Sequence, residues 1–439
     1  MAVILLAGPG FASLPTVVLL VVAYGGFLAA VAGPATIDRR LVIGLGSTLL
    51  VLAVVRPPMQ SHDLWSYVMY GRTVSQHQAS PYTHPPATFH ADPFLARVDP
   101  LWRHTRSVYG PLFTAASAVF TRVAGSSALV ARLGFQLAAA CAVALAALLV
   151  HRRTRGDPRA LALVLLNPLV IFSLVNDAHL DVFVGVAVLG AVLLVERRRG
   201  WAAGLLLGAA ILIKAIALLP AGALGIWLLT RRDRRALVVP LAAALVTVVL
   251  AGYAVGGGRT AIQPVLDSST HLSGASVWTP LVRAEIDDEE REGNSPEAAR
   301  TEVGRKISHV ATLVVLGLTV ALALAWRRDD DALAVAGGAV LVFTLGAAYV
   351  YPWYLAGGVF ALAARRRSPL TWLLVGSGLL LQLATVPGRQ FTTFVHRQQR
   401  LPDPVWHQWL RNWGAPGLEL VLVGVLLVVM GRKVLAART

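Results

Sequence analysis

Apolar runs of membrane-spanning length recur along the whole 439-residue chain, and they limit the fold more than any other feature. A helix needs about 20 apolar residues to cross a bilayer, whose interior admits only structures that pair their own backbone groups. Hydrophobic residues make up 56% of the chain and charged residues only 14%, a balance that no soluble domain needs. The sequence therefore predicts an all-α polytopic membrane protein in which residues 1–439 form a single domain.

The apolar runs predict about 12–14 membrane segments. The segments are expected at 11–33, 41–55, 109–123, 128–150, 160–175, 180–195, 202–217, 218–230, 236–256, 307–326, 332–350, 353–364, 370–386 and 414–431. We interpret the first as a retained helix, because no basic stretch precedes it. The stretch 202–230 is either one tilted helix or two helices broken near Leu219-Pro220, and Pro352 predicts a break before 353–364.

Most of the positive charge lies in short arginine runs between apolar segments, and the formal net charge is +16. The runs are Arg152-Arg153, Arg197–Arg199, Arg231-Arg232, Arg327-Arg328, Arg365–Arg367 and Arg432-Lys433. This is the pattern of cytoplasmic loops, which also attract anionic membrane lipids. No nucleic-acid motif accompanies the charge, so we expect membrane lipids and no nucleic acid as partners.

With the arginine runs inside, the loops 56–108, 257–306 and 387–413 lie outside, together with two short turns near 176–181 and 350–353. Two full crossings at 109–123 and 128–150 would, however, put Arg152-Arg153 outside. We therefore expect 109–123 to be re-entrant or only partly inserted. The polar clusters then share one face, which predicts a multi-pass plasma-membrane protein with an extracytoplasmic active site.

The first outer loop begins with a polar, aromatic stretch that carries Asp63. A carboxylate beside an apolar core is a candidate general base for a substrate hydroxyl. His62 is a candidate second base or phosphate ligand, and Arg72 is expected to orient Asp63 or to contact an anionic substrate. Tyr67 and Tyr82 are further candidate substrate-binding residues. The alternative is an interfacial anchor loop without chemistry.

The same loop ends with three cationic side chains in four positions, Arg103, His104 and Arg106, followed by Tyr109. Such a group suits a phosphate at the membrane surface. The alternative is anchoring at the lipid headgroups.

A third polar cluster lies between two apolar segments and contains Asn176, Asp177, His179 and Asp181. Ionisable residues so near a bilayer are costly and are functional candidates. The alternative is a divalent-metal site. Because no second set of ligands is present, the sequence requires no metal.

Lys214 lies about 20 Å along the helix that starts near Arg199, at about 1.5 Å per residue. This places it near the outer surface, where it is expected to contact a lipid phosphate; the alternative is snorkelling to the interface. Trp353 and Tyr354 mark another outer boundary and are expected to stack against a sugar, with an aromatic belt as the alternative.

The sequence contains no Gly-rich phosphate loop of the kind that binds nucleotides. We therefore expect no cofactor. If the protein is a transferase, an activated group delivered by a membrane lipid fits better than a sugar nucleotide used in the cytosol.

Several motifs occur in a specific order between about 55 and 360. They are the Asp63 loop, Ser80-Pro81-Tyr82, Val98–Thr105, Tyr109–Phe113, Asn167-Pro168-Leu169, Ala178–Asp181, the Lys214 helix and Pro352–Leu355. In these motifs the chain resembles the GT-C superfamily, and more narrowly the actinobacterial polyprenyl-phosphate-mannose-dependent α-1,6-mannosyltransferases.

This resemblance implies a GT-C-type helix bundle, a polyprenyl-phosphate-sugar donor, a glycan or glycolipid acceptor, and transfer with inversion. It implies that Asp63 deprotonates the acceptor hydroxyl. His179 and Asp181 would position the acceptor or the sugar, and Lys214 with Arg103 or Arg106 would hold the donor phosphate. One departure is Leu180, which stands where the family has Asn.

Two alternatives remain open. One is a transporter or flippase of a lipid-linked glycan, which would place polar residues across the membrane midplane; here the apolar segments carry charge mainly near their ends. The other is an arabinofuranosyltransferase of the same superfamily, whose donor machinery would look alike.

Overall fold

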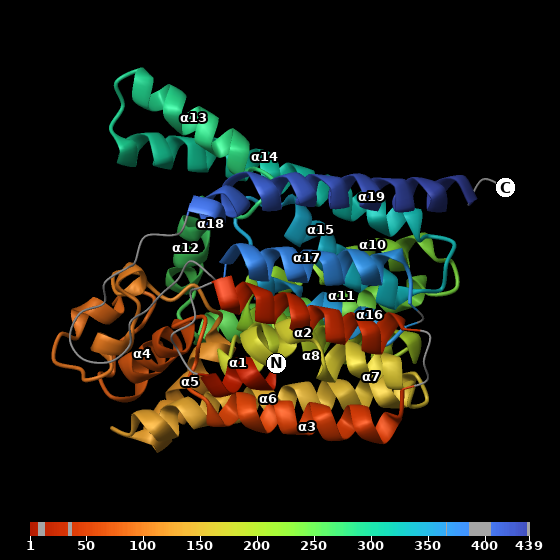
Figure 1. Ribbon diagram of the computed structural model, residues 1–439, viewed down its shortest axis with the longest axis horizontal. Helices are drawn as coiled ribbons and strands as arrows, with labels where there is room; N and C mark the ends of the chain where they lie inside the picture. The colour runs from red at the N-terminus through yellow and green to blue at the C-terminus, as the bar shows by residue number, and fades with distance from the viewer. Residues whose placement is uncertain (8–13, 34–36, 366, 386–404, 437–439) are drawn as a thin grey trace.

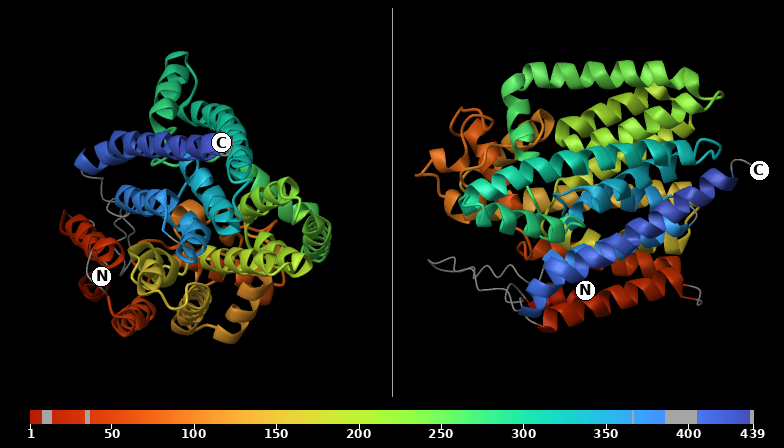
Figure 2. Two further views of the ribbon diagram at one scale, coloured as in Figure 1. Left: turned by 90° about the vertical axis from the view of Figure 1, so that its right-hand side faces the viewer. Right: turned by 90° about the horizontal axis from the view of Figure 1, so that it is seen from above.

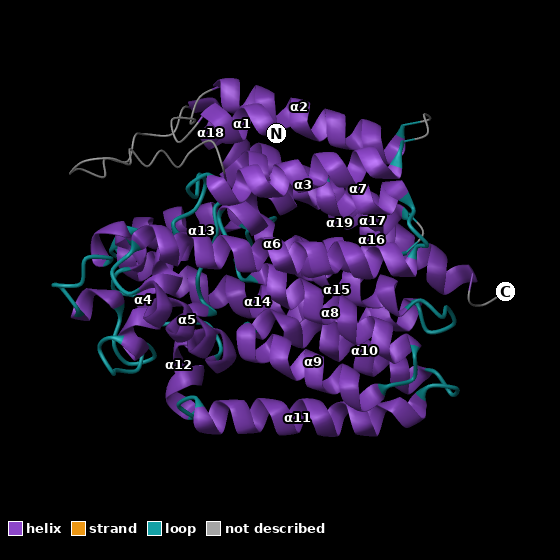
Figure 3. Ribbon diagram, turned by 90° about the horizontal axis from the view of Figure 1, so that it is seen from below, coloured by secondary structure: helices purple, strands orange, loops and turns teal. Residues whose placement is uncertain are grey.

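The computed structural model describes residues 1–7, 14–33, 37–365, 367–385 and 405–436, and all regular elements in these ranges are helices (Figure 3). A helix satisfies its own backbone N–H and C=O groups, as a bilayer requires. The prediction of an all-α polytopic membrane protein is confirmed.

Most helices run side by side between two ends of the molecule (Figure 1), and a view turned by 90° shows them partly end-on (Figure 2). These bundle helices are α2 (Leu14–Ala32), α3 (Arg39–Val55), α6 (Ala128–Arg153), α7 (Pro158–Leu165), η4 (Val170–Asn176), α8 (Asp181–Glu196), α9 (Gly200–Ile213), α10 (Leu218–Thr230), α11 (Val238–Val255), α14 (Pro296–Ala325), α15 (Ala332–Gly346), α16 (Ala356–Ala363), α17 (Pro369–Thr385) and α19 (Ala415–Ala436). Figure 3 shows α11 at the edge of the bundle.

The end on the left of Figure 1, called the loop end below, carries most of the remaining elements. They are α4 (Asp63–Ser75), α5 (Pro111–Ala124), α12 (Arg259–Ser268), α13 (Thr279–Arg291) and α18 (Val405–Trp409), with the shorter elements η1 (Pro86–Thr88), η2 (Leu95–Arg97), η3 (Pro100–Trp102), η5 (Ala215–Ala217), η7 (Pro352–Leu355) and η8 (Leu410–Gly414). Two further short helices are α1 (Ala2–Ala7) and η6 (Arg235–Leu237). Much of the predicted outer loop 387–413 lies outside the described residues.

Within the described ranges, 3 helices are long and apolar enough to cross a membrane on their own: Ala128–Arg153, Arg235–Val255 and Pro296–Ala325. The bent pair Pro158–Leu165 and Val170–Asn176, with 51° between its halves, is a fourth if it counts as one span. The other bundle helices are shorter or broken. The number of complete crossings stays a prediction.

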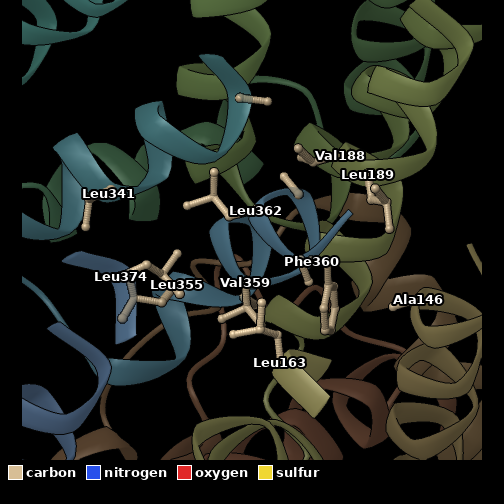
Figure 4. Packing of buried hydrophobic residues seen from close by; sticks show 14 of the residues in the cluster. Ala146, Leu163, Val188, Leu189, Leu341, Leu355, Val359, Phe360, Leu362 and Leu374 are labelled. Carbon is tan, nitrogen blue, oxygen red and sulfur yellow. The ribbon is translucent and has the colours of Figure 1, made fainter. Parts of the chain in front are cut away.

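The apolar core is centred on α16, all of whose residues are buried. Its sequence is apolar on every side, so it fits only where other helices surround it. Figure 4 shows Val359, Phe360 and Leu362 projecting from α16 among side chains of neighbouring helices, including Leu163 and Val188. This core holds the helices whose ends carry the polar clusters.

The opposite end, called the connector end below, gathers the basic runs. Arg153 pairs with Glu196 at 2.9 Å, Arg234 with Asp330 at 2.7 Å, and Lys433 with Asp329 at 3.0 Å. Arg365 also pairs with Asp331. The basic runs that the sequence grouped on one side of the membrane are therefore joined to one another in space.

The segment 109–123 does not cross the bundle. It forms α5, which has 14 residues and is about 21 Å long at 1.5 Å per residue, shorter than a bilayer's hydrocarbon core. The Gly110 N–H at its start donates to the Ile213 carbonyl, and the Gly125 carbonyl after its end accepts from Arg72. Both contacts lie at the loop end, so α5 packs along that end beside α4, and Arg152-Arg153 remain with the other basic runs.

The break in the stretch 202–230 is at Lys214 and not near Leu219-Pro220. Lys214 has extended backbone angles (φ −156°, ψ 132°) between α9 and η5. Pro220 lies in the first turn of α10, where a missing N–H removes no helical hydrogen bond. The break before 353–364 occurs as predicted, because α15 ends at Gly346 and η7 begins at Pro352.

Candidate active site

Asp63 is the first residue of α4, and half-buried His62 precedes it. The Asp63 N–H donates to the Ser61 hydroxyl at 3.2 Å. A carboxylate in the first turn faces the positive end of the helix dipole, which favours its ionised form. Its side chain is 18% exposed, so a substrate hydroxyl can reach it. Asp63 thus combines charge and access, as a general base requires.

His179 brings Asp63 and Tyr67 together. Its Nδ1 lies 3.6 Å from Asp63 Oδ2 and 3.3 Å from the Tyr67 hydroxyl. Burial, and then the charges of Asp63 and Asp181, raise the pKa of Tyr67 well above its usual value, so this hydroxyl stays protonated at neutral pH. Three residues that were predicted separately therefore form one cluster.

An aromatic stack continues this cluster. The His179 ring lies on Trp353 with centroids 3.7 Å apart and planes 11° apart, and Trp353 lies on Tyr351 at 4.6 Å and 9°. Aromatic side chains commonly line the sites of small ligands. Trp353 therefore lies beside the candidate base. A residue of an aromatic belt would instead face lipid.

Lys214 and Asp181 form a second polar pair in the same cluster. Lys214 Nζ donates to both oxygens of Asp181 at 2.9 and 2.8 Å, and it lies 4.2 Å over the ring of Tyr354. Asp181 is only 2% exposed, and a buried carboxylate without a cation would be costly. Lys214 is therefore held in the cluster. The sequence predicts instead that its side chain reaches toward the lipid surface.

The Tyr109-Gly110-Pro111 motif docks on the end of α9. The Gly110 N–H donates to the Ile213 carbonyl at 3.0 Å, and a Cβ on Gly110 would lie 2.2 Å from the Leu212 carbonyl oxygen. Only glycine fits so close an approach. The contact brings Tyr109 to the segment that leads directly into Lys214.

Tyr82 supports this turn from behind. Its hydroxyl donates to the Tyr109 carbonyl at 3.1 Å and lies 3.0 Å from the Thr114 hydroxyl. Burial raises the pKa of Tyr82 to about 12, so the hydroxyl remains a donor. The side chain that we predicted to bind substrate is thus used to position Tyr109.

Arg72 pairs with Asp92 and does not orient Asp63, which was the first of its two predicted roles. Its Nε donates to both oxygens of Asp92 at 3.0 and 2.9 Å, and its Nη1 donates to the Gly125 carbonyl at 2.6 Å. His77 Nε2 also lies 2.8 Å from Asp92. A buried arginine needs a carboxylate partner. The Arg72–Asp92 pair fastens α4 to the outer loop.

Asn176 and Asp177 hold the chain segment that enters α4. The Asn176 amide donates to three carbonyls of residues 53–57 at 3.0 to 3.1 Å and accepts from the Met59 N–H. Asp177 Oδ1 accepts from the Met59 and Gln60 N–H groups, both at 3.0 Å. Both side chains are fully buried, so they fasten the approach to Asp63 rather than face a substrate. Burial raises the pKa of Asp177 to about 8.

Ala178 turns the chain between these fastening residues and His179. Its φ of 55° is left-handed, which costs a non-glycine residue about 1–2 kcal/mol. Strain of this kind persists only where the surroundings impose it, often at functional sites. The turn lets Asp177 face back toward residues 59–60 while His179 faces Asp63.

The cations at 103–106 do not converge on one point. Arg103 Nε donates to the Val98 carbonyl at 3.1 Å, Arg106 pairs with Asp267 at 2.7 Å, and His104 is exposed. The joint phosphate site predicted for this group is not formed. Arg106 instead joins the first outer loop to α12.

No group of three or more His, Cys, Asp or Glu side chains in the described ranges is placed to hold a metal ion. Asp177 is bonded to residues 59–60, and Asp181 is bonded to Lys214, so the Asp, His and Asp of this loop do not meet. We expected a reaction that needs neither a metal nor a cofactor, and this expectation stays a prediction.

Two supporting residues were not predicted. Asp92 holds Arg72, and Gln136, on α6, donates to the Asn176 carbonyl at 2.6 Å and to the Arg56 carbonyl at 2.9 Å. The signal for Gln136 was a polar side chain inside an apolar run, which usually has a specific partner. Asp92 carried no local signal.

A family model described as alpha-(1->6)-mannopyranosyltransferase, N-terminal domain, matches residues 10–231. Over 339 residues the chain is 29% identical to alpha-(1->6)-mannopyranosyltransferase A of Mycobacterium tuberculosis, covering 73% of this chain and 63% of that protein. Over 186 residues it is 27% identical to the protein of the same name from Corynebacterium glutamicum, covering 41% of this chain and 37% of that protein.

The chain thus aligns with less than two thirds of the length of either relative. The range of the family model nevertheless includes Asp63, His179, Asp181 and Lys214, which the fold gathers into one cluster. The chain belongs to the alpha-(1->6)-mannopyranosyltransferase family.

Proposed function

We propose that this protein is a membrane glycosyltransferase that moves mannose from a polyprenyl-phosphate donor to a glycan or glycolipid acceptor. Family membership supports the class of reaction, and both named relatives are mannopyranosyltransferases. The observation that carries the proposal is the Asp63 carboxylate, partly exposed at a helix N-terminus and 3.6 Å from a buried histidine on an aromatic stack.

In the proposed reaction, the acceptor hydroxyl approaches Asp63 and attacks the anomeric carbon of the sugar. The new bond joins the acceptor oxygen to that carbon, and the bond from the carbon to the phosphate oxygen breaks. The hydroxyl proton passes to Asp63, and the electron pair leaves with the lipid phosphate. A single displacement of this kind inverts the anomeric configuration. A phosphate is a good leaving group, so no second carboxylate is needed as a general acid.

Lys214 is the proposed partner of the leaving phosphate. Its ammonium has three donors, and Asp181 accepts two of them. The third can serve a phosphate oxygen as negative charge develops there. Asp181 then acts as a positioning residue, because it fixes the ammonium beside Tyr354.

His179 is proposed to position Asp63 and to present the sugar-facing stack. Its Nδ1 lies near the carboxylate, while its ring face is covered by Trp353. Replacement by a residue without a ring would disturb both the base and the stack.

We place this chemistry on the extracytoplasmic side. The connector end carries the arginine runs typical of cytoplasmic loops, and the proposed active site lies at the opposite end of the bundle (Figure 1). A polyprenyl-phosphate donor is consistent with that side, because a membrane lipid brings its sugar to the membrane surface.

The activity is tested with the purified full chain in detergent micelles. Radiolabelled polyprenyl-phosphate-mannose and polyprenyl-phosphate-arabinose are offered separately with a cell-envelope acceptor fraction. We expect label to move from the mannose donor alone, and the new linkage to have the opposite anomeric configuration to the donor. Transfer only from the arabinose donor would make the protein an arabinofuranosyltransferase. No transfer from either donor by folded protein would overturn the proposal and favour transport.

A further inference from the structure

Two arginines lie where α3 ends, at the loop end of the bundle. Arg56 directly follows α3, and Arg132 lies near the start of α6, which packs against α3 (Figure 1). Arg132 Nη1 donates to the carbonyls of Val54 and Val55, both at 3.2 Å. It also donates to Gln136 Oε1 at 2.8 Å. The guanidinium of Arg132 is therefore held directly beside the backbone that leads into Arg56.

Half of the Arg132 guanidinium is not used by the protein. All of its hydrogen bonds to the residues that the structure describes are made by Nη1. Nε and Nη2 remain, and together they form an edge of the guanidinium that can bind two oxygens of a carboxylate or a phosphate. Unlike Arg56 Nε, neither nitrogen is fully enclosed. An anion at the surface can therefore reach this edge.

Arg72 shows what an equally buried arginine requires. Arg72 and Arg132 are both 8% exposed, and Arg72 Nε donates to both oxygens of Asp92. Within the described ranges, neither Arg132 nor Arg56 has such a carboxylate, and Arg56 Nε is enclosed without any hydrogen-bond partner. An enclosed cation without an anion is costly. The two arginines therefore favour an anionic ligand.

The surface around the two arginines is apolar. Val55, at the end of α3, and Leu129 and Val130, in the first turn of α6, are all exposed. Because the bundle lies in a membrane, we expect acyl chains against these side chains. A free inorganic anion gains nothing from such a surface. A phospholipid matches both parts of it, because its phosphate can meet the arginines while its acyl chains meet the apolar side chains.

This position does not suit the phosphate of the sugar donor. The donor phosphate is bonded to the reacting carbon, so it has to lie beside the hydroxyl that Asp63 deprotonates. From Arg132, the contacts pass through Gln136 to Asn176 before they reach the loop that carries His179. Gln136 and Asn176 are fully buried. A phosphate at Arg132 is therefore separated from the reacting carbon by packed side chains.

The charge of the site also selects among phospholipids. An ethanolamine headgroup would bring an ammonium group close to two arginines, and like charges repel at short range. A glycerol headgroup leaves the phosphodiester with its net negative charge.

We infer that the ends of α3 and α6 form a binding site for an anionic phospholipid, whose phosphodiester accepts hydrogen bonds from Arg132 and Arg56. This inference goes beyond the proposed sugar transfer and does not depend on it. The bound lipid stabilises the end of α3, which Asn176 also holds through the carbonyls of residues 53–57. This stretch leads directly toward Asp63.

Binding is tested with the purified full chain, delipidated in a non-ionic detergent. The probes are dihexanoyl-phosphatidylglycerol, dihexanoyl-phosphatidylethanolamine, dihexanoylglycerol, inorganic phosphate and farnesyl phosphate, each titrated by isothermal calorimetry. Arg56→Gln removes a side chain that makes no hydrogen bond in the described part of the protein, so the fold is expected to survive. Arg132→Lys keeps the charge but not the paired donors. The matched control is Arg259→Gln, at an exposed arginine of α12.

We expect phosphatidylglycerol to bind the wild-type protein and the control equally, and to bind Arg56→Gln and Arg132→Lys at least about tenfold more weakly. Equal affinity for wild type and Arg56→Gln would overturn the inference. So would equal affinity of the wild-type protein for dihexanoylglycerol or for inorganic phosphate, because a lipid phosphate would then not be recognised. Equal affinity for phosphatidylethanolamine would overturn the assignment to an anionic lipid.

Farnesyl phosphate serves as a short analogue of a polyprenyl phosphate. We expect both substitutions to leave its affinity unchanged. If they weaken the binding of farnesyl phosphate and not that of phosphatidylglycerol, the arginines serve the donor lipid and the inference is overturned.

Thermal unfolding in lipid nanodiscs gives a second readout, because a ligand that binds the folded state stabilises it. We expect the wild-type protein and Arg259→Gln to unfold at a higher temperature in phosphatidylglycerol than in phosphatidylethanolamine, and Arg132→Lys to lose most of this difference. The same difference in all three proteins would assign the effect to the bilayer and contradict the inference. Neither readout involves sugar transfer, so a failure of the proposed function is recognised separately.

Discussion

Two ion pairs at opposite ends of the bundle differ in burial. At the connector end, the pair Arg153–Glu196 joins the ends of α6 and α8, and its side chains are 44% and 25% exposed. At the loop end, Lys214 and Asp181 pair with side chains only 15% and 3% exposed. Exposed pairs contribute little to stability, whereas a buried charge that loses its partner is costly. The difference indicates that the buried pair holds the site, whereas the exposed pair contributes little to it.

The largest expected effect on stability comes from breaking the buried pair with Lys214→Met. The substitution keeps the apolar stem and leaves Asp181 without its cation, which should lower the free energy of unfolding by about 3–5 kcal/mol. Chemical unfolding in detergent measures it. The matched control adds Asp181→Leu to the same variant, and we expect it to restore most of the loss. A double variant no more stable than the single one would contradict the account of this pair.

The next effect comes from Gly110→Ala, which tests the close approach between the Tyr109 turn and α9. The new Cβ would lie 2.2 Å from the Leu212 carbonyl oxygen, and overpacking of this kind costs about 1–3 kcal/mol. The control is Gly222→Ala in α10, where nothing lies within 4 Å of the added atom. Thermal unfolding should show a loss only at Gly110. Equal shifts at both positions would mean that this approach does not constrain the turn.

A further effect, which depends on pH, is expected at Asp177. Its pKa in the folded protein is about 8, above the ordinary value of 3.8, so the folded state binds the proton more tightly than the unfolded state. The resulting stabilisation is full below about pH 4, declines as the pH rises, and is lost once the pH passes about 8.

Asp177→Asn removes that titration while its amide oxygen can still accept from the Met59 and Gln60 N–H groups. Thermal unfolding between pH 5 and pH 8 should therefore show a smaller decline for the variant than for the wild-type protein. Parallel curves would show that Asp177 does not titrate in this range.

The smallest effect is expected at the connector end. Arg153→Ala breaks an exposed pair with Glu196 and should change the free energy of unfolding by only about 0–1 kcal/mol, and by less at high salt. Unfolding at low and high ionic strength checks this. A loss as large as that of Lys214→Met would remove the difference between the two ends.

The helical class and the grouping of the basic runs could be predicted from sequence because both follow from local patterns. Apolar runs separated by arginines specify helices and their connectors without any knowledge of long-range contacts. The position of the break near Lys214 could not be predicted in this way. Pro220 looked like the breaker, but proline is tolerated in the first turn of a helix.

The candidate site was predicted as a set of residues but not as an arrangement. Asp63, His179, Lys214 and Trp353 each carried a signal of their own, and only the fold shows that they meet. Arg72 was misassigned because its partner, Asp92, lies 20 residues away with no pattern to connect them. Pairings between side chains depend on tertiary geometry, which hydropathy and motif spacing do not encode.

Sugar transfer is expected to depend on the carboxylate of Asp63 at the loop end. The most direct test compares initial rates of transfer from polyprenyl-phosphate-mannose for Asp63→Asn and for Glu196→Gln, which neutralises a carboxylate at the connector end. We predict a loss of at least about a hundredfold for Asp63→Asn, as expected for a general base, and a rate within about twofold of the wild-type protein for Glu196→Gln. Equal rates for the two variants, with both proteins folded, would contradict the account.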